Sequence, residues 1–192
     1  MRPGLMDPTL DSQRIFRGLL EAVSHPGRIV DVAGDVEGPA PLHPAAMAVC
    51  LTLLDFETPL WLDGAAARPD VLDWLRFHCG APVVARAEAA RFALVADPSA
   101  MPALQAFDAG APEYPDRSTT VIVQARTLLG GVGWRLTGPG IEGETRLDVD
   151  GVPETFRGWL RDNHAAFPRG VDTVLTAGRM LAALPRTTRV EA

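Results

Sequence analysis

The sequence predicts an α/β fold, a three-layer α/β/α sandwich built on a mixed sheet. The 192-residue chain is 47% hydrophobic, which suffices for a sizeable core, and its length suits one domain over residues 1–192. Residues 119–125 (TTVIVQA) form an unbroken, largely β-branched run, typical of a central strand covered on both faces. Segments with helical periodicity alternate with strand-like segments, which places helices on both faces of the sheet.

The first half of the chain is predicted to be rich in helices. A helix over 10–24 begins after the cap-like pair at 7–8 and ends at the Pro-Gly pair at 26–27. Its apolar stripe consists of Ile15, Phe16, Leu19, Leu20 and Val23. The other expected elements are a strand at 28–32, a helix at 44–54 that is apolar on nearly all sides, a strand at 59–62 and a helix at 69–77.

The second half is predicted to be rich in strands. Strands at 133–137 and 145–149 flank GPGIEG, a turn-rich stretch that indicates a hairpin-like reversal. That stretch formally spells GxGxxG, but a proline follows its first glycine and no helix follows its last, so a tight turn is favoured over a phosphate loop. The other expected elements are a strand at 91–95, a short helix at 99–107, a helix at 152–165, strands at 172–176 and 180–184, and the tail PRTTRVEA.

The composition excludes several kinds of chemistry. All 18 basic residues are arginines, so no lysine can form an aldimine with pyridoxal phosphate (PLP) or act in a phosphate loop. The net charge of −6 gives no general attraction to nucleic acid or to anionic membranes. We therefore expect polyanions to be met only by local arginine clusters, whose planar forks suit phosphate. No apolar run is long enough for a membrane span or a signal peptide, and a cytoplasmic protein is expected.

The two cysteines do not form a recognisable metal motif. Cys50 and Cys79 lie far apart in the sequence, and no CxxC pair or Cys/His run accompanies them. Reduced, largely buried thiols are the favoured interpretation. A disulfide or a metal site shared with a partner is the alternative.

His78 is the histidine with the strongest functional signal. It ends a predicted helix in RFHCG, beside Arg76, where the two side chains could meet an anion or move a proton. His25 and His43 precede prolines in turn-like segments, so surface turn positions are favoured for both. His164 lies near a helix end, where the helix dipole favours a cation.

Two further sites are candidates. Asp55 and Glu57, in LLDFET, could act as paired carboxylates, although turn chemistry also explains an aspartate after a helix. Arg186 and Arg189, in the polar tail, could hold phosphate or pair with the carboxylates of a partner. A solvated terminus is the alternative there.

Five segments together resemble the PhnH family, a subunit of the bacterial carbon–phosphorus lyase complex. They run in order over nearly the whole chain, and the ordered set is specific although each segment alone is weak. Cys79 and His25 depart from the family pattern, which places functional claims about those two side chains in doubt. The segments are FRGLLEAVSHPG, LTLLDFETPLWL, LRFHCGAP, RLTGPGI, and FPRGVDTVLTAG with LPRTTRVE.

The resemblance implies a fold similar to the large domain of PLP-dependent transferases, without the cofactor. The absence of lysine agrees with that expectation. It further implies action with the G, I and J subunits, and with a protein of the ATP-binding-cassette type. In that system the ribose triphosphate of ATP is transferred to an alkylphosphonate and adenine is displaced. The J subunit then cleaves the carbon–phosphorus bond by radical iron–sulfur chemistry, for which this chain has no cysteine set.

The leading hypothesis is therefore a subunit of that assembly that lacks a catalytic constellation of its own and binds no cofactor. The alternatives are a stand-alone phosphonate- or nucleotide-processing enzyme and a metabolite-binding module. Either would use an anion site drawn from Arg76, His78 and Arg186, the residues proposed to bind substrate. A subunit should expose apolar surface, and we expect a homodimer when the chain is isolated.

Overall fold

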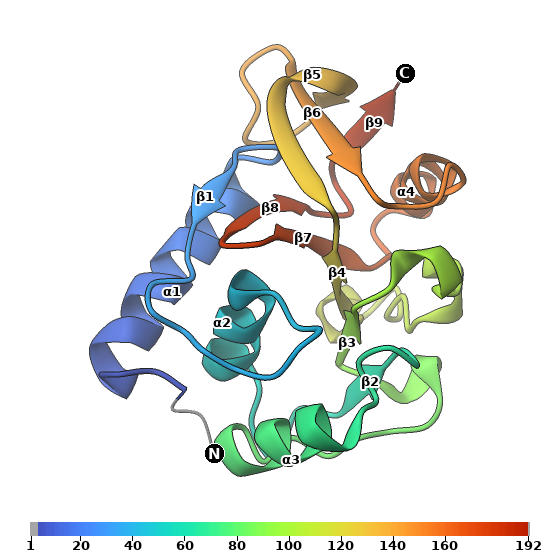
Figure 1. The fold of residues 1–192 in the computed structure, drawn as a ribbon. Coiled ribbons are helices and arrows are strands. Elements are labelled where there is room, and N and C mark those ends of the chain that lie inside the picture. The colour runs from blue at the N-terminus through green and yellow to red at the C-terminus, as the bar shows by residue number, and fades with distance from the viewer. Residues whose placement is uncertain (1–3, 192) are drawn as a thin grey trace.

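The computed structural model describes residues 4–191, which form two β-sheets and four α-helices (Figure 1). The helices are α1 (Pro8–Ser24), α2 (Pro44–Leu53), α3 (Pro69–His78) and α4 (Phe156–Ala165). The larger sheet has the order β1-β8-β7-β4-β3-β2, and the smaller has the order β6-β5-β9. The strands are β1 (Val30–Asp31), β2 (Leu60–Leu62), β3 (Phe92–Val95), β4 (Thr120–Gln124), β5 (Thr127–Thr137), β6 (Thr145–Asp150), β7 (Asp172–Ala177), β8 (Met180–Leu184) and β9 (Arg189–Glu191).

The larger sheet is mixed, as the sequence predicts. Strands β2, β3, β4 and β7 pair in parallel, whereas β8 is antiparallel to both of its neighbours, β7 and β1. The parallel strands are separated by long crossover segments, of which α3 is one. The prediction of a mixed α/β protein is therefore confirmed.

The hydrophobic core lies on both faces of this sheet. Residues of α1, α2 and α3 pack against one face, and α4 with the smaller sheet packs against the other (Figure 1). Side chains point alternately to the two faces along β4. Ile122 belongs to the first core cluster, on the side of α1, α2 and α3, whereas Val121 and Val123 belong to the second core cluster, on the side of α4 and the smaller sheet. All three are completely buried, which explains why this strand consists of a continuous apolar run.

The apolar stripe predicted for the first helix is divided between core and solvent. Ile15 and Leu19 are buried in α1, together with Ala22. Phe16, Leu20 and Val23 lie further around the helix and are 41–50% exposed. The helix starts at Pro8, where the Asp7 carboxylate accepts hydrogen bonds from the amides of Thr9 and Leu10. Within residues 4–191 no helix combines the length and the apolar character that crossing a bilayer requires.

The short helix predicted at 99–107 is wrong. The segment contains two isolated 3₁₀ turns, Pro98–Ala100 and Leu104–Ala106. Pro102 separates them, because proline cannot donate the next helical hydrogen bond and holds the preceding residue extended. Met101 has that extended backbone, with ψ 146°.

The smaller sheet begins with the predicted reversal, since β5 and β6 are antiparallel around GPGIEG. Strand β5 is longer than expected and starts at Thr127. Its register shifts between Gly130 and Trp134. Gly133 has a φ of +82°, and a Cβ added there would lie 2.6 Å from the Asp148 Cα, so only glycine fits this bulge.

The C-terminal tail is not a solvated terminus. Arg189–Glu191 forms β9, which pairs with the end of β5, and Val190 is 3% exposed within the second core cluster. The apolar part of this strand is a single valine between polar neighbours. That is too short for a recognisable alternation in the sequence.

Candidate functional site

The carboxyl edge of the parallel strands is the usual ligand site of open α/β sheets, and here the chain's own groups occupy it. Asp63 follows β2 and is 5% exposed. Its carboxylate accepts hydrogen bonds from the amides of Ala66, Ala96 and Asp97, at 2.8, 3.1 and 2.8 Å. These contacts join the ends of β2 and β3, so Asp63 has a structural role that its place in the sequence does not reveal.

The next strand end is occupied in the same way. Gln124, the last residue of β4, accepts a hydrogen bond from the His43 amide at 2.5 Å and donates one to the Pro41 carbonyl at 3.1 Å. Nδ1 of His43 accepts from the Gly178 amide at 3.3 Å. His43 therefore lies half-buried directly before α2, not at the surface turn position that the sequence favours. Burial lowers the pKa of its imidazole, and the Thr176 carbonyl partly opposes this.

A cleft of about 820 Å³ lies where two of the resembling segments meet, and we name it the turn cleft. Gly140 packs closely against the end of α1. A Cβ added at Gly140 would lie 2.0 Å from the Ser24 carbonyl oxygen. Arg28 pairs with Glu21 at 2.8 Å, and Glu144 pairs with Arg135 at 3.4 Å. The turn cleft is lined by His25, Pro26, Arg28, Gly140, Ile141, Glu142, Glu144 and Thr145.

Ser24 directly precedes His25, a residue of the turn cleft, but the two side chains are not in an activating arrangement. Ser24 Oγ lies 3.2 Å from His25 Nδ1. The same nitrogen lies 3.1 Å from the Glu21 carbonyl oxygen, which can only accept, so Nδ1 carries the proton. Ser24 Oγ directs its own proton to the Leu20 carbonyl at 2.7 Å. His25 therefore cannot take a proton from Ser24, and this pair is not a nucleophile with its base.

Arg76 and His78 occupy the last turn of α3. Arg76 is 79% exposed and lies 3.7 Å from Asp73, a loose surface ion pair. The His78 ring contacts Trp74 and Phe77, with ring centroids 4.9 Å apart in each case. The N-terminal segment covers this ring, because a Cβ at Gly4 would lie 3.0 Å from His78 Nδ1. The cation at position 76 is thus open to solvent, whereas His78 is packed among apolar groups.

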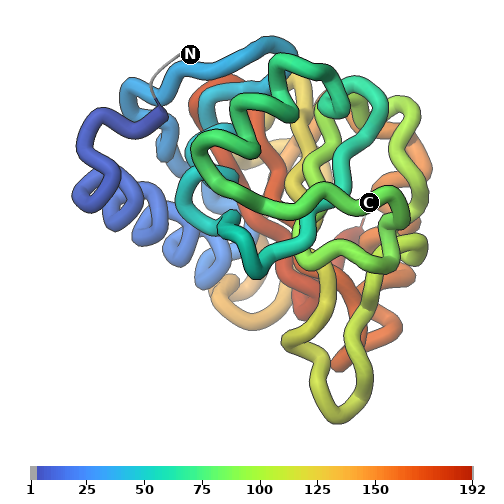
Figure 2. Tube along the Cα trace, turned by 90° about the horizontal axis from the view of Figure 1, so that it is seen from below, coloured from blue at the N-terminus to red at the C-terminus, as the bar shows by residue number. Residues whose placement is uncertain are grey.

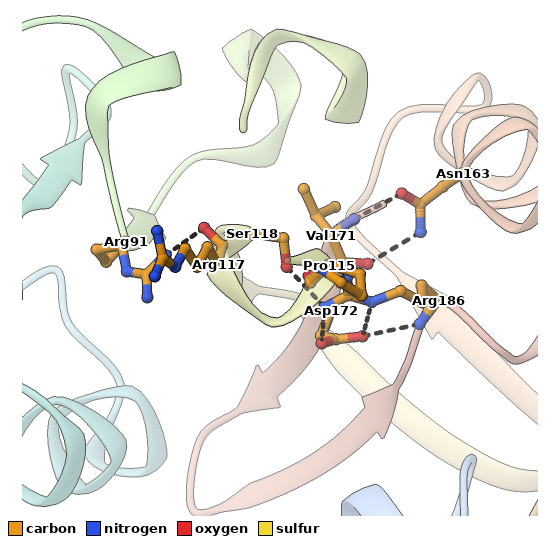
Figure 3. A network of polar contacts seen from close by, with 8 residues as sticks. All are labelled: Arg91, Pro115, Arg117, Ser118, Asn163, Val171, Asp172 and Arg186. Carbon is orange, nitrogen blue, oxygen red and sulfur yellow. Dashed lines mark hydrogen bonds and ion pairs between the residues drawn. The ribbon is translucent and has the colours of Figure 1, made fainter. Parts of the chain in front are cut away.

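Arg186 is enclosed in a network of its own chain (Figure 3). The side chain is 11% exposed, and it forms a bidentate pair with Asp172 through Nε at 3.2 Å and Nη2 at 2.6 Å. Nη1 donates to the Pro115 carbonyl at 2.5 Å, and Nη2 also donates to Ser118 Oγ at 2.6 Å. These contacts direct the guanidinium fork inward. The side-chain partners of Arg186 described here come from β7 and from residues 115–118, whereas Arg76 and His78 lie on α3.

A buried amide supports the segment beside this network. Asn163 of α4 accepts from the Val171 amide at 2.8 Å and donates to the Val171 carbonyl at 2.9 Å (Figure 3). His164, the next residue, faces the Arg186 carbonyl through Nδ1 at 3.2 Å. Both residues connect α4 to β7 and to the chain after β8. The sequence marks neither pairing, because the partners lie 8 and 22 positions away.

The carboxylate pair in LLDFET forms a turn. The Asp55 side chain accepts from the Glu57 amide at 2.9 Å, and Thr58 Oγ1 accepts from the Asp55 amide at 2.7 Å. Both carboxylates are exposed. Turn chemistry therefore explains Asp55. Across residues 4–191 there is no group of three or more His, Cys, Asp or Glu side chains placed to hold a metal ion.

Both cysteines are free thiols, which agrees with the favoured interpretation of the sequence. Cys79 Sγ donates to the Cys50 carbonyl at 3.6 Å. Burial raises the pKa of Cys79 to about 12. Burial, together with the nearby Cys79, also raises the pKa of Cys50 well above its usual range. Neither thiol is a thiolate at neutral pH, so neither is an activated nucleophile.

Helix α1 presents an apolar surface to solvent. Phe16, Leu20 and Val23, which we name the α1 ridge, are 44%, 50% and 41% exposed. Leu10, near the start of the helix, is 64% exposed. Contiguous apolar side chains on a helix face mark a contact surface more often than isolated ones do. The ridge ends beside the turn cleft, because His25 and Pro26 follow α1 directly.

Comparisons with known proteins agree with the family resemblance that the sequence segments indicate. A family model described as bacterial phosphonate metabolism protein (PhnH) matches residues 3–191. The chain is 40% identical over 185 residues to the alpha-D-ribose 1-methylphosphonate 5-triphosphate synthase subunit PhnH of Rhizobium meliloti (strain 1021), covering 96% of this chain and 92% of that protein. It is 34% identical over 181 residues to the putative C-P lyase subunit protein HtxG of Stutzerimonas stutzeri, covering 93% of this chain and 85% of that protein.

Proposed function

Because the chain belongs to the PhnH family of bacterial phosphonate metabolism proteins, we propose that it is a subunit of a carbon–phosphorus lyase assembly. The observation that carries this proposal is the 40% identity, over nearly the full length of both chains, to a subunit of ribose 1-methylphosphonate 5-triphosphate synthase. The second relative, named as a putative subunit of a C-P lyase, supports the same role. Its part in catalysis is therefore exercised within the complex.

The geometry supports a subunit better than a self-contained enzyme. At the ends of β2 and β4, where a substrate would be expected, the Asp63 and Gln124 side chains bond to the chain's own backbone. Ser24 and His25, next to the turn cleft, are in the wrong protonation arrangement for nucleophilic attack. The α1 ridge offers apolar surface for a protein contact.

We further propose the finer features of this role. The partners are the G-, I- and J-type subunits, with which the chain supports transferase chemistry in the cytoplasm, namely transfer of ribose triphosphate from ATP to an alkylphosphonate. Alone, the single domain forms a homodimer through the α1 ridge, which carries no charged side chain of its own. The mixed sheet between two packed faces is consistent with an α/β/α sandwich like the large domain of PLP-dependent transferases.

The test is reconstitution of the synthase reaction. The chain is purified alone and with the three partner subunits, and adenine release from ATP and methylphosphonate is followed. We expect adenine only when all subunits are present, and a preparation that lacks this chain should lose activity. Full activity from this chain alone would overturn the proposal, as would an unchanged rate in its absence.

The same assay tests the proposed substrate contacts. Of the three residues proposed from the sequence, Arg76 has the most accessible charge, the His78 ring is packed against Trp74 and Phe77, and Arg186 is already bonded to Asp172. Arg76→Gln and His78→Asn are compared with Arg86→Gln, another exposed arginine in a loose pair. A raised KM for ATP or phosphonate only in the first two variants supports substrate contact. Unchanged kinetics of both variants in assembled complexes would rule out substrate contact by Arg76 and His78.

A further inference from the structure

Helix α1 lies at the outer edge of the molecule, where a second copy can reach it. Figure 1 and Figure 2 both show this helix, in blue, at the periphery of the fold. Its buried side consists of Ile15, Leu19 and Ala22, whereas the α1 ridge and two charged residues, Arg17 and Glu21, face solvent. The order of these exposed groups around the helix determines how two copies can meet.

The exposed side chains of α1 are sorted by polarity on the two sides of Leu20. Successive residues of an α-helix are rotated by about 100°, which places Phe16 and Val23 on one side of Leu20 and Arg17 and Glu21 on the other. We name the first pair the apolar flank and the second pair the charged flank. Both residues of the apolar flank are more than 40% exposed, at 44% and 41%.

The charged flank retains groups that can bind a partner. Of the charged residues of α1, Asp11 and Arg14 pair with each other at 3.6 Å. Glu21 accepts from Arg28 at 2.8 Å through Oε1, so its other oxygen remains, and its side chain is 49% exposed. Arg17 forms no ion pair among the residues that the structure describes. The flank therefore offers one cation and one carboxylate, four residues apart on the same side of the helix.

Only one of the two simple two-fold arrangements matches these flanks. An axis that runs along the helices pairs them parallel and sets the apolar flank of one copy against the charged flank of the other, which leaves charges facing apolar groups. An axis that runs across the helices pairs them antiparallel and sets each flank against the same flank of the second copy. The antiparallel arrangement is therefore favoured.

The antiparallel arrangement also fits in register. Phe16 faces Val23 of the second copy, Leu20 faces Leu20, and Arg17 faces Glu21. The midpoints of these three pairs lie within about one residue of one another along α1, which corresponds to about 1.5 Å. A single axis near Leu20 thus serves the apolar and the charged contacts together. This self-complementarity selects a second copy of the chain as the partner.

We propose that two copies pair through α1 as an antiparallel helix pair, with reciprocal ion pairs between Arg17 of each copy and Glu21 of the other. This inference rests on the homodimer in the proposed function and adds its orientation and its charged contact. The start of α1 in one copy then lies near the turn that follows α1 in the other. Because that turn lines the turn cleft, the second copy borders the cleft.

The first experiment measures the dissociation constant of the isolated dimer by analytical ultracentrifugation. The variants are Arg17→Glu, Glu21→Arg and the double variant with both changes. Arg28→Gln is the matched control, because it breaks the ion pair of Glu21 inside one chain and leaves the proposed contact between copies. Arg126→Glu, at an exposed ion pair elsewhere, changes the net charge by the same amount as Arg17→Glu. Circular dichroism verifies the fold of each variant.

We expect each single variant to weaken the dimer at least about tenfold, because the two-fold axis turns both ion pairs into like-charge contacts. The double variant should recover most of the wild-type affinity, since exchanging the two charges restores attraction between the copies. Neither control should weaken the dimer. Single variants that weaken the dimer without recovery in the double variant would overturn the reciprocal pair.

Cysteine crosslinking under mild oxidation tests the orientation without changing charge. Copies with Phe16→Cys should crosslink to copies with Val23→Cys but not to each other, because positions 16 of the two copies are separated by about 10 Å along the helices. Leu20→Cys should crosslink to itself. Wild type, whose two thiols are buried or half-buried, is the control. Efficient crosslinking of Phe16→Cys to itself would overturn the antiparallel orientation.

The outcomes separate this inference from the proposed function. If wild type is a dimer and the charge variants dimerise equally well, the arrangement is wrong and the homodimer stands. If wild type is a monomer, the homodimer fails and this inference fails with it. The role as a subunit of the assembly is decided independently, by adenine release in the reconstituted system.

Discussion

At the residue scale, His43 links the protonation state of one side chain to the stability of the fold. Its Nδ1 accepts from the Gly178 amide, so the proton of the neutral ring lies on Nε2. Burial lowers its pKa below the usual 6.5, which means that the folded state favours the neutral ring. As pH falls below about 6.5, the unfolded chain binds a proton before the folded chain does. The contribution of His43 to the free energy of unfolding is thus present above about pH 6.5 and is lost as the pH falls through the pKa of His43 in the folded state.

We predict that His43→Asn flattens this pH dependence. The Asn Oδ1 can accept from Gly178 in place of Nδ1 and does not titrate. Urea unfolding midpoints at pH 7.5 and pH 5 should differ less for the variant than for wild type. His25→Asn, at an exposed turn, is the control and should keep the wild-type difference. An equal difference in wild type and His43→Asn would contradict the prediction.

The sequence marks the type of a polar residue but not its distant partner. Arg186 is a plausible anion-binding residue by type, yet its contacts to Asp172, Ser118 and Pro115 span 14, 68 and 71 positions. Asp63 gave no signal, because two of the amides that it binds lie more than 30 positions away. Asp55 was interpretable, since its turn partners lie two and three residues on.

At the element scale, the junction of α1 with the β5–β6 turn depends on one glycine. Gly140 has a φ of +82°, and its missing side chain admits the Ser24 carbonyl at the end of α1. Gly143 lies in the same turn with a φ of +70° and has nothing within 4 Å of an added Cβ. At either position a residue other than glycine would have a strained backbone. Of these two, only Gly140 would also have a steric conflict, with the Ser24 carbonyl.

We predict that Gly140→Ala destabilises the protein more than Gly143→Ala. The conformational cost of a positive φ is about 1–2 kcal/mol at either position. At Gly140 the clash with Ser24 adds to it, so the free energy of unfolding should fall by roughly 3 kcal/mol or more. Chemical denaturation of both variants measures the difference. Equal losses would show that the turn moves away from α1 at little cost.

Local pattern explains which elements could be predicted. α2 is apolar on all sides and buried, and β8 is a clear apolar run between turn residues, so their positions follow from the sequence. The helix expected at 99–107 failed because Pro102 interrupts it. Strand β9 was missed because its order comes from pairing with β5, which no short pattern in the tail announces.

At the scale of the whole molecule, the α1 ridge is the surface through which we propose that two copies meet. Its three side chains, Phe16, Leu20 and Val23, are uncharged and are 41–50% exposed. A two-fold contact between copies would bring the same three apolar side chains of both chains together.

We predict that Leu20→Glu converts the isolated protein from a dimer to a monomer. Leu20 is 50% exposed, so the fold tolerates the change, while a buried, unpaired carboxylate in a dimer contact is costly. Light scattering should give the mass of two 20.5 kDa chains for wild type and of one chain for the variant. Leu129→Glu, at a similarly exposed residue of β5, should remain dimeric. A monomeric wild type would rule out the dimer.

The strand order of the larger sheet also determines when its parts can assemble. Strand β1 has β8 as its partner in the sheet, and β8 in turn pairs with β7, which pairs with β4. Residues 30–31 therefore cannot join the sheet before residues 180–181 have been synthesised. The pairing of β1 with β8 therefore cannot follow the order of translation.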